Sequence, residues 1–133
     1  MKEHLDETSR QEIIKYRIEK SDSALQEADI LAINNFFDIA VTRLYYACYY
    51  LASALLIKEG SETTTHAGVK RMFSLKFIRT GILDQKYFQI LSNLLQGRQL
   101  SDYEDFIYQD EVSYQLYRSE AINFCNKVKE LLI

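Results

Sequence analysis

Apolar residues recur at spacings of three and four along most of the chain, which is the pattern of amphipathic helices. The most apolar stretch covers residues 36–60, and between 39 and 57 only Thr42, Arg43 and Ser53 are neither apolar nor aromatic. A helix that is apolar on nearly every face needs neighbours on several sides, so we predict that it is the central helix of a bundle. A membrane span is the weaker alternative, because the uninterrupted apolar part is shorter than the roughly 20 residues that a bilayer requires.

Capping and turn residues divide the remaining chain into further helices. We expect a first helix over 9–34, opened by an S-x-x-E capping box at Ser9, and we expect the central helix to end at Gly60. A short helix should follow over 66–79 after Thr65. A fourth helix should begin after Asp84, and a last helix should run from Asp110 to the C-terminus. Residues 1–8 are expected to fray, and the fourth helix to be interrupted around 104–109. The predicted fold is all-α, an up-down antiparallel bundle of four long helices and one short helix in a single domain over 1–133.

Composition and charge narrow the function. The net charge of −3 and the pI near 5.4 provide no general attraction to nucleic acid, so such binding needs a local basic patch. Cys48 and Cys125 fall within helical patterns and are expected to be reduced core thiols. The cysteines and histidines lack metal-ligand spacing, so we predict no metal site and no cofactor. The N-terminus has no apolar signal region, which predicts a cytoplasmic protein.

Two arginines fall on otherwise apolar helix faces. Arg43 lies in the central helix with Tyr46 three residues later, and its charge requires carboxylates, carbonyls or a polar cleft. An ion pair to a neighbouring helix and a nucleotide or phosphate contact are the two alternatives. Arg98 continues the apolar stripe of the fourth helix, with Asp102 four residues later and Tyr103 beside it. An intrahelical salt bridge would be a weak reason to place this charge there, so a functional or interface role is the competing interpretation.

Two further features near these arginines remain open. Gly97 weakens its helix by roughly 1 kcal/mol relative to alanine, which indicates close approach of a partner chain or a ligand. The tyrosines clustered in the central helix and in the segment 103–117 fit either a base-stacking cleft or, as we expect for most of them, a core or dimer interface.

Several dispersed motifs resemble one protein family. They are KYRIEKSDSALQEA, AVTRLYYACYYLASALL, THAGVKRMF, FIRTGILD and GRQLSDYED, in this order along nearly the whole chain. The chain is similar to the small prokaryotic HEPN domains, named for higher eukaryotes and prokaryotes nucleotide-binding. The resemblance implies a helical bundle, usually a homodimer, often paired with a minimal nucleotidyltransferase in toxin–antitoxin systems.

Many HEPN proteins are metal-independent RNases with the motif R-x(4–6)-H. The resemblance places the motif arginine on Arg98, but the positions open to its histidine hold Tyr103, Glu104 and Asp105. The chain therefore resembles the branch with R-x-x-x-D-Y, and Arg98, Asp102 and Tyr103 are the candidate catalytic residues. Tyr103 is also the nearest counterpart of the tyrosine that the partner nucleotidyltransferase adenylylates in some HEPN toxins.

His66, in the THAG motif, is the one histidine in a family-like segment. It could bind phosphate and replace the missing acid–base group if the fold brings it beside Arg98, or it could merely help to cap the short helix. Two functions remain open. One is a dimeric, metal-independent RNase of toxin–antitoxin type; the other is a non-catalytic HEPN module that binds a nucleotide or a partner protein.

Overall fold

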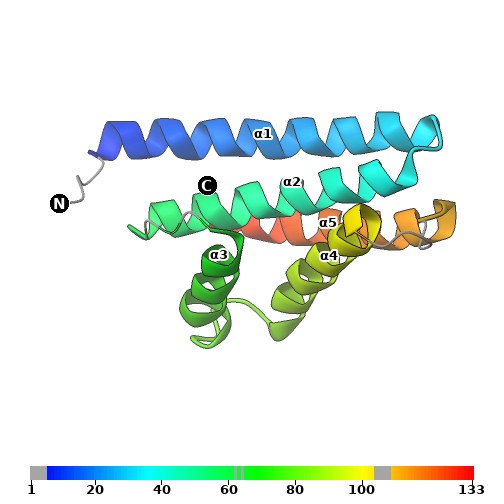
Figure 1. The fold of residues 1–133 in the computed structure, drawn as a ribbon. Helices are drawn as coiled ribbons and strands as arrows, with labels where there is room; N and C mark the ends of the chain where they lie inside the picture. The colour runs from blue at the N-terminus through cyan, green and yellow to red at the C-terminus, as the bar shows by residue number, and fades with distance from the viewer. Residues whose placement is uncertain (1–5, 62, 64, 104–108) are drawn as a thin grey trace.

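All regular elements in the described part of the chain are helical. The computed structural model describes residues 6–61, 63, 65–103 and 109–133. Its elements are α1 (Glu7–Ile33), α2 (Phe37–Lys58), α3 (His66–Phe73), the π-helical turn η1 (Ser74–Ile78) that continues α3, α4 (Gln85–Tyr103) and α5 (Glu111–Leu132) (Figure 1). The predicted all-α bundle of four long helices and one short helix is confirmed.

Helix α2 is the centre of the bundle, as its apolar sequence predicts. It contacts each of the other four α-helices, and residues such as Leu44, Leu51 and Leu55 are almost completely buried. Among the described helices, α2 is the one with the length and hydropathy of a membrane span, but 67% of its most apolar window is buried inside the protein. Packing against its own chain therefore accounts for the hydropathy of α2.

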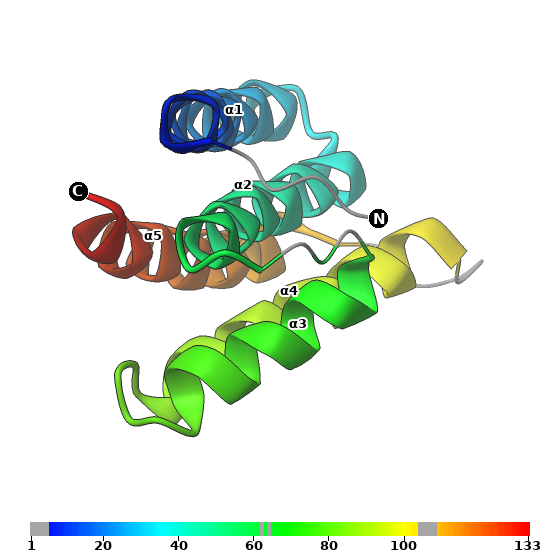
Figure 2. The same cartoon turned by 90° about the vertical axis from the view of Figure 1, so that its left-hand side faces the viewer.

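The other helices lie on different sides of α2. Helices α1 and α2 form an antiparallel hairpin, whose turn includes Asn35 in the left-handed region with φ of 64°. Figure 2 shows α5 beside α2, and the pair α3 and α4 running obliquely across another side of α2. The pair presents its buried residues, including Val69, Phe73, Leu91 and Leu94, to the common core. This leaves the outer faces of α3 and α4 available to form a site.

The two predicted N-caps, Thr65 and Asp84, are present, and Asp110, which was predicted to open the last helix, is a third N-cap. The side chains of Thr65, Asp84 and Asp110 each accept a hydrogen bond from a backbone N–H two or three residues later, at 2.8–3.0 Å. These bonds satisfy N–H groups that have no partner within the helix. Thr65 therefore fixes the start of α3 and with it the position of His66.

The start of the first helix differs from the prediction. Asp6, rather than Ser9, is the N-cap of α1, and its carboxylate accepts the Ser9 backbone N–H at 2.7 Å. Asp6 caps as well as serine does, and Glu7 then adds a negative charge at the positive end of the helix. The predicted frayed segment was thus too long, because Glu7 and Thr8 are helical; residues 1–5 lie outside the described residues.

The close approach that Gly97 indicated lies within the chain. A Cβ atom on Gly97 would lie 2.9 Å from Cζ of Tyr117, so α4 and α5 approach closely here. The expectation of a partner chain or ligand at this glycine is therefore replaced by a helix–helix contact. Cys48 and Cys125 are buried free thiols, with their Sγ atoms 3.9 Å apart, as predicted for core cysteines.

Candidate functional site

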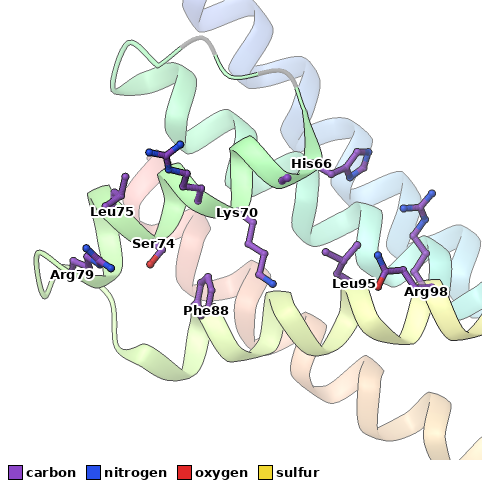
Figure 3. Close-up of a pocket in the computed structure, with 11 residues that line it drawn as sticks. His66, Lys70, Ser74, Leu75, Arg79, Phe88, Leu95 and Arg98 are labelled. Carbon is purple, nitrogen blue, oxygen red and sulfur yellow. The ribbon is translucent and has the colours of Figure 1, made fainter.

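A cavity of about 780 Å³ lies between the outer faces of α3, η1 and α4. This volume falls within the range of about 300–1,000 Å³ that is typical of ligand sites. The cavity is lined by His66, Ala67, Lys70, Arg71, Ser74, Leu75, Arg79, Phe88, Leu95, Arg98 and Gln99. Figure 3 shows His66 and Arg98 at one end and Arg79 at the other, with Lys70 reaching from α3 towards α4 between them.

The cavity is positively charged in a protein whose net charge is −3. Lys70, Arg71, Arg79 and Arg98 supply four cations, and none of the described residues that line it is acidic. This is the local basic patch that nucleic-acid binding by so acidic a chain requires. The patch consequently favours a phosphate-containing ligand.

Helix geometry gathers these side chains on one face. His66 and Lys70 on α3 and Ser74 at the start of η1 are spaced by four residues and therefore lie one above another, while Val69 and Phe73 face the core. Three cations of this segment line the cavity, Lys70, Arg71 and Arg79, and none of them was singled out from the sequence. Their signal was available, because residues 66–79 include four lysines and arginines and no acidic residue.

His66 lies against the tyrosine cluster of α2, which consists of Tyr45, Tyr46, Tyr49 and Tyr50. The Tyr45 hydroxyl and Nδ1 of His66 share a hydrogen bond of 2.7 Å, whose donor depends on the histidine tautomer. The His66 ring also stacks on Tyr49, with 4.2 Å between ring centroids and 19° between planes. These contacts fix the imidazole orientation at the end of the cavity.

Arg98 reaches the same tyrosine cluster from α4. Its Cζ atom lies 5.8 Å from the ring centroid of Tyr45 and 5.4 Å from that of Tyr46. Burial lowers the pKa of His66, and the positive charge of Arg98 lowers it further. His66 is therefore mainly neutral at neutral pH, the state in which an imidazole can accept a proton.

The other predicted site residues are placed differently. Arg43 does not line the cavity; it pairs with Glu27 on α1 at 3.7 Å and lies 5.5 Å from the centre of the Tyr46 ring. This contact is of the first kind considered for Arg43, an ion pair to a neighbouring helix. The backbones of Asp102 and Tyr103 belong to the last turn of α4, but their side chains lie outside the described residues. Glu104, Asp105 and the rest of the predicted interruption over 104–109, apart from Gln109, also lie outside the described residues.

Comparison with known proteins identifies the family. The family model of the HEPN domain matches residues 14–132, nearly the whole chain. This chain belongs to the HEPN family. A Methanocaldococcus jannaschii protein named as a putative toxin is 35% identical over 118 residues, which cover 87% of this chain and 79% of that protein. A second M. jannaschii protein of the same designation is 33% identical over 133 residues, covering 99% of this chain and 97% of its own length.

A relative from Thermotoga maritima, named only as a UPF0332 protein, is 27% identical over 123 residues, covering 92% of this chain and 93% of that protein. Within this HEPN chain, Arg98 and the following Gln99 both line the cavity. Because His66 lines it too, the fold supplies an imidazole from α3, although Tyr103, Glu104 and Asp105 occupy the motif positions at which a histidine is usual.

Proposed function

We propose that this HEPN protein is a toxin-type, metal-independent endoribonuclease that acts in the basic cavity between α3 and α4. The observation that carries the proposal is that His66 and Arg98 line one end of the same cavity. RNA cleavage without a metal needs a proton acceptor, a proton donor and a cation beside the reacting phosphate. His66 and Arg98 supply one proton-transfer group and one such cation.

In the proposed reaction the RNA 2′-oxygen forms a bond to the adjacent phosphorus, and the bond from phosphorus to the 5′-oxygen breaks. His66 accepts the proton of the 2′-hydroxyl, and the 5′-oxygen leaves with a proton from a second acid. Arg98 stabilises the negative charge that accumulates on the phosphorane oxygens. The products are a 2′,3′-cyclic phosphate and a free 5′-hydroxyl.

The surroundings of His66 suit the role of base. If Nδ1–H donates to the Tyr45 oxygen, Nε2 carries no proton and can accept one from the RNA. Burial raises the pKa of Tyr45 above its ordinary value, so the phenol stays neutral and does not compete for this proton. Tyr45 is accordingly a positioning residue in the proposal.

The proposal includes a homodimer and a minimal nucleotidyltransferase as the antitoxin partner, as the HEPN resemblance implies. A second copy would bring another His66 or the 102–103 segment to the phosphate and so supply the proton donor. The toxin designation of two relatives supports this assignment.

A cleavage assay with a chelator present tests the proposal. Purified wild type, Arg98→Ala, His66→Gln and Arg43→Ala are incubated with total RNA, and the mass of each oligomer is measured. We expect the Arg98 and His66 variants to lose about 100-fold or more of the cleavage rate, as removal of a proton-transfer group or charge stabiliser does. Arg43→Ala is the matched control, because this arginine also lies against Tyr46 but outside the cavity.

Absence of cleavage by a folded, dimeric wild type would overturn the catalytic proposal. The second candidate function would then take its place: a non-catalytic HEPN module whose basic cavity binds a nucleotide. The absence of histidine at the usual motif positions is the observation that favours this candidate.

A further inference from the structure

The end of the cavity away from His66 has a composition of its own. Leu75 and Phe88 form an apolar wall there, and Lys70 and Arg79 are the cations beside it, whereas Leu95 lies nearer Arg98 (Figure 3). The Lys70 ammonium lies 5.4 Å from the centre of the Phe88 ring. Leu75 is 36% exposed although it is a large apolar side chain, and Phe88 is only half-buried.

The π-helical turn η1 brings Arg79 to this end. The backbone N–H of Arg79 donates to the carbonyl of Ser74 at 2.9 Å, a bond that spans five residues. In an α-helix, five residues rotate about 500°, which would turn Arg79 well away from Ser74. In a π-turn five residues make about one full turn, so Arg79 stays near the face of Lys70 and Ser74.

Such turns are uncommon and occur frequently at functional sites. Here the extra residue in the turn places a cation at the end of a cavity whose opposite end holds Arg98. Phe88 of the apolar wall and Lys70 lie between the two arginines (Figure 3). This order of cation, apolar wall and cation matches the order of phosphate, base and phosphate along a nucleic-acid strand.

We infer that Leu75, Arg79 and Phe88 form a subsite for one nucleotide of single-stranded RNA next to the scissile phosphate. The base packs on the exposed part of Phe88 and on Leu75, and Arg79 and Lys70 bind the phosphates on its two sides. A duplex hides its base faces within the stack, so this subsite selects unpaired RNA. The inference rests on the proposed function for the position of the scissile phosphate, but the subsite can be tested without cleavage.

The probe is a short fluorescein-labelled 2′-O-methyl RNA of mixed sequence, which lacks the 2′-hydroxyl proton and cannot be cleaved. Binding is followed by fluorescence anisotropy at several salt concentrations, with the strand single or annealed to its complement. We expect the full-length protein to bind the single strand about tenfold or more tightly than the duplex, because base stacking contributes only to the former.

Two pairs of variants assign the roles of individual residues. Arg79→Ala should weaken binding and lower the slope of log K against log salt by about 0.7, the value for one phosphate contact on a single strand. Lys76→Ala is its matched control, because Lys76 belongs to the same turn but does not line the cavity. Phe88→Ala should weaken binding about 5- to 100-fold, whereas Phe88→Trp, which keeps an aromatic ring, should retain it.

Equal effects of Arg79→Ala and Lys76→Ala, or preference for the duplex, would overturn the subsite. So would failure to bind the strand while a fluorescein-labelled polyglutamate peptide binds, because the basic face would then fit an acidic protein segment. The subsite and the catalytic proposal can fail separately. If the strand binds as expected but no RNA is cleaved, only the catalytic proposal is contradicted. If RNA is cleaved and cleavage requires Arg98, but binding is unchanged by Arg79→Ala and Phe88→Ala, only the subsite is contradicted.

Discussion

The hydroxyl group of Tyr45 lies 2.7 Å from Nδ1 of His66, and this contact joins the buried face of α2 to the first residue of α3. Tyr45 is only 2% exposed, so the bond attaches the histidine to the rigid centre of the bundle. Arg98 lies over the ring of the same tyrosine. Tyr45 therefore connects the two groups that the proposed reaction needs.

Replacing Tyr45 with phenylalanine should change the titration of His66 without unfolding the protein. In the proposed tautomer Nδ1–H donates to Tyr45, and a charged imidazole donates more strongly than a neutral one. Removal of the acceptor should therefore lower the pKa of His66 still further, as measured by NMR of the imidazole protons. RNA cleavage should fall about fivefold, which corresponds to one hydrogen bond of about 1 kcal/mol. A higher pKa in the variant would show that the tyrosine is the donor.

Because His66 titrates, the free energy of unfolding should depend on pH in the mildly acidic range. Burial and Arg98 lower its pKa below the ordinary value of 6.5, so the unfolded chain binds this proton more readily than the folded chain. The contribution of His66 is therefore fully present above about pH 6.5 and is lost as the pH falls below that value. Urea unfolding of wild type and His66→Gln, followed from neutral to mildly acidic pH, checks this. The difference between their free energies of unfolding should shrink on acidification, and a constant difference would contradict the prediction.

Asp29 should stabilise the contact between α1 and α5. Its carboxylate accepts hydrogen bonds from Arg118 Nε at 2.7 Å and Nη2 at 3.0 Å, and from the buried Tyr114 hydroxyl at 2.8 Å. We expect Asp29→Ala to lower the free energy of unfolding by about 1–3 kcal/mol, because the phenol loses its acceptor.

The Arg118 hydrogen bond holds the pKa of Asp29 below 3.8, so its stabilisation is present above that pH and is lost as the pH falls through the lowered value. Chemical denaturation in acid measures this loss. The exposed Asp22 pairs with Lys129 at 2.6 Å and serves as the comparison. Asp22→Ala should cost only about 0–1 kcal/mol, as for most surface ion pairs, and equal losses from the two substitutions would argue against the role of Tyr114.

Glycine should be needed at position 97 because the Tyr117 side chain leaves no room for a Cβ atom, not because the helix favours glycine there. A Cβ on Gly97 would meet Cζ, Oη and Cε1 of Tyr117 at 2.9–3.1 Å. Gly97→Ala should therefore destabilise the wild type, even though alanine favours a helix by about 1 kcal/mol. In a Tyr117→Leu background, which lacks the ring tip, the same change should stabilise by about that amount. Thermal or urea unfolding of the four proteins in this cycle measures the coupling, and the same sign in both backgrounds would contradict it.

The sequence alone determined the features that depend on neighbouring residues. Thr65, Asp84 and Asp110 predicted three helix starts correctly, because a cap bonds to an N–H only two or three residues away. The apolar run of α2 predicted its central position, because such a surface can be buried only among several helices. At the first helix the same reasoning chose Ser9 over Asp6, since both residues cap well and local chemistry does not separate them.

Only the tertiary structure decided which chemical groups share a site. Arg98 was singled out from its position on an apolar stripe, but its relation to His66 depends on how α3 and α4 pack on α2. The π-turn that directs Arg79 to the cavity has no signal in the spacing of residues 66–79, because a single extra residue in a helical turn is set by packing at both its ends. The basic patch likewise became visible only when residues distant in sequence were brought to one surface of an acidic protein, since net charge sums over the chain whereas binding depends on the local field.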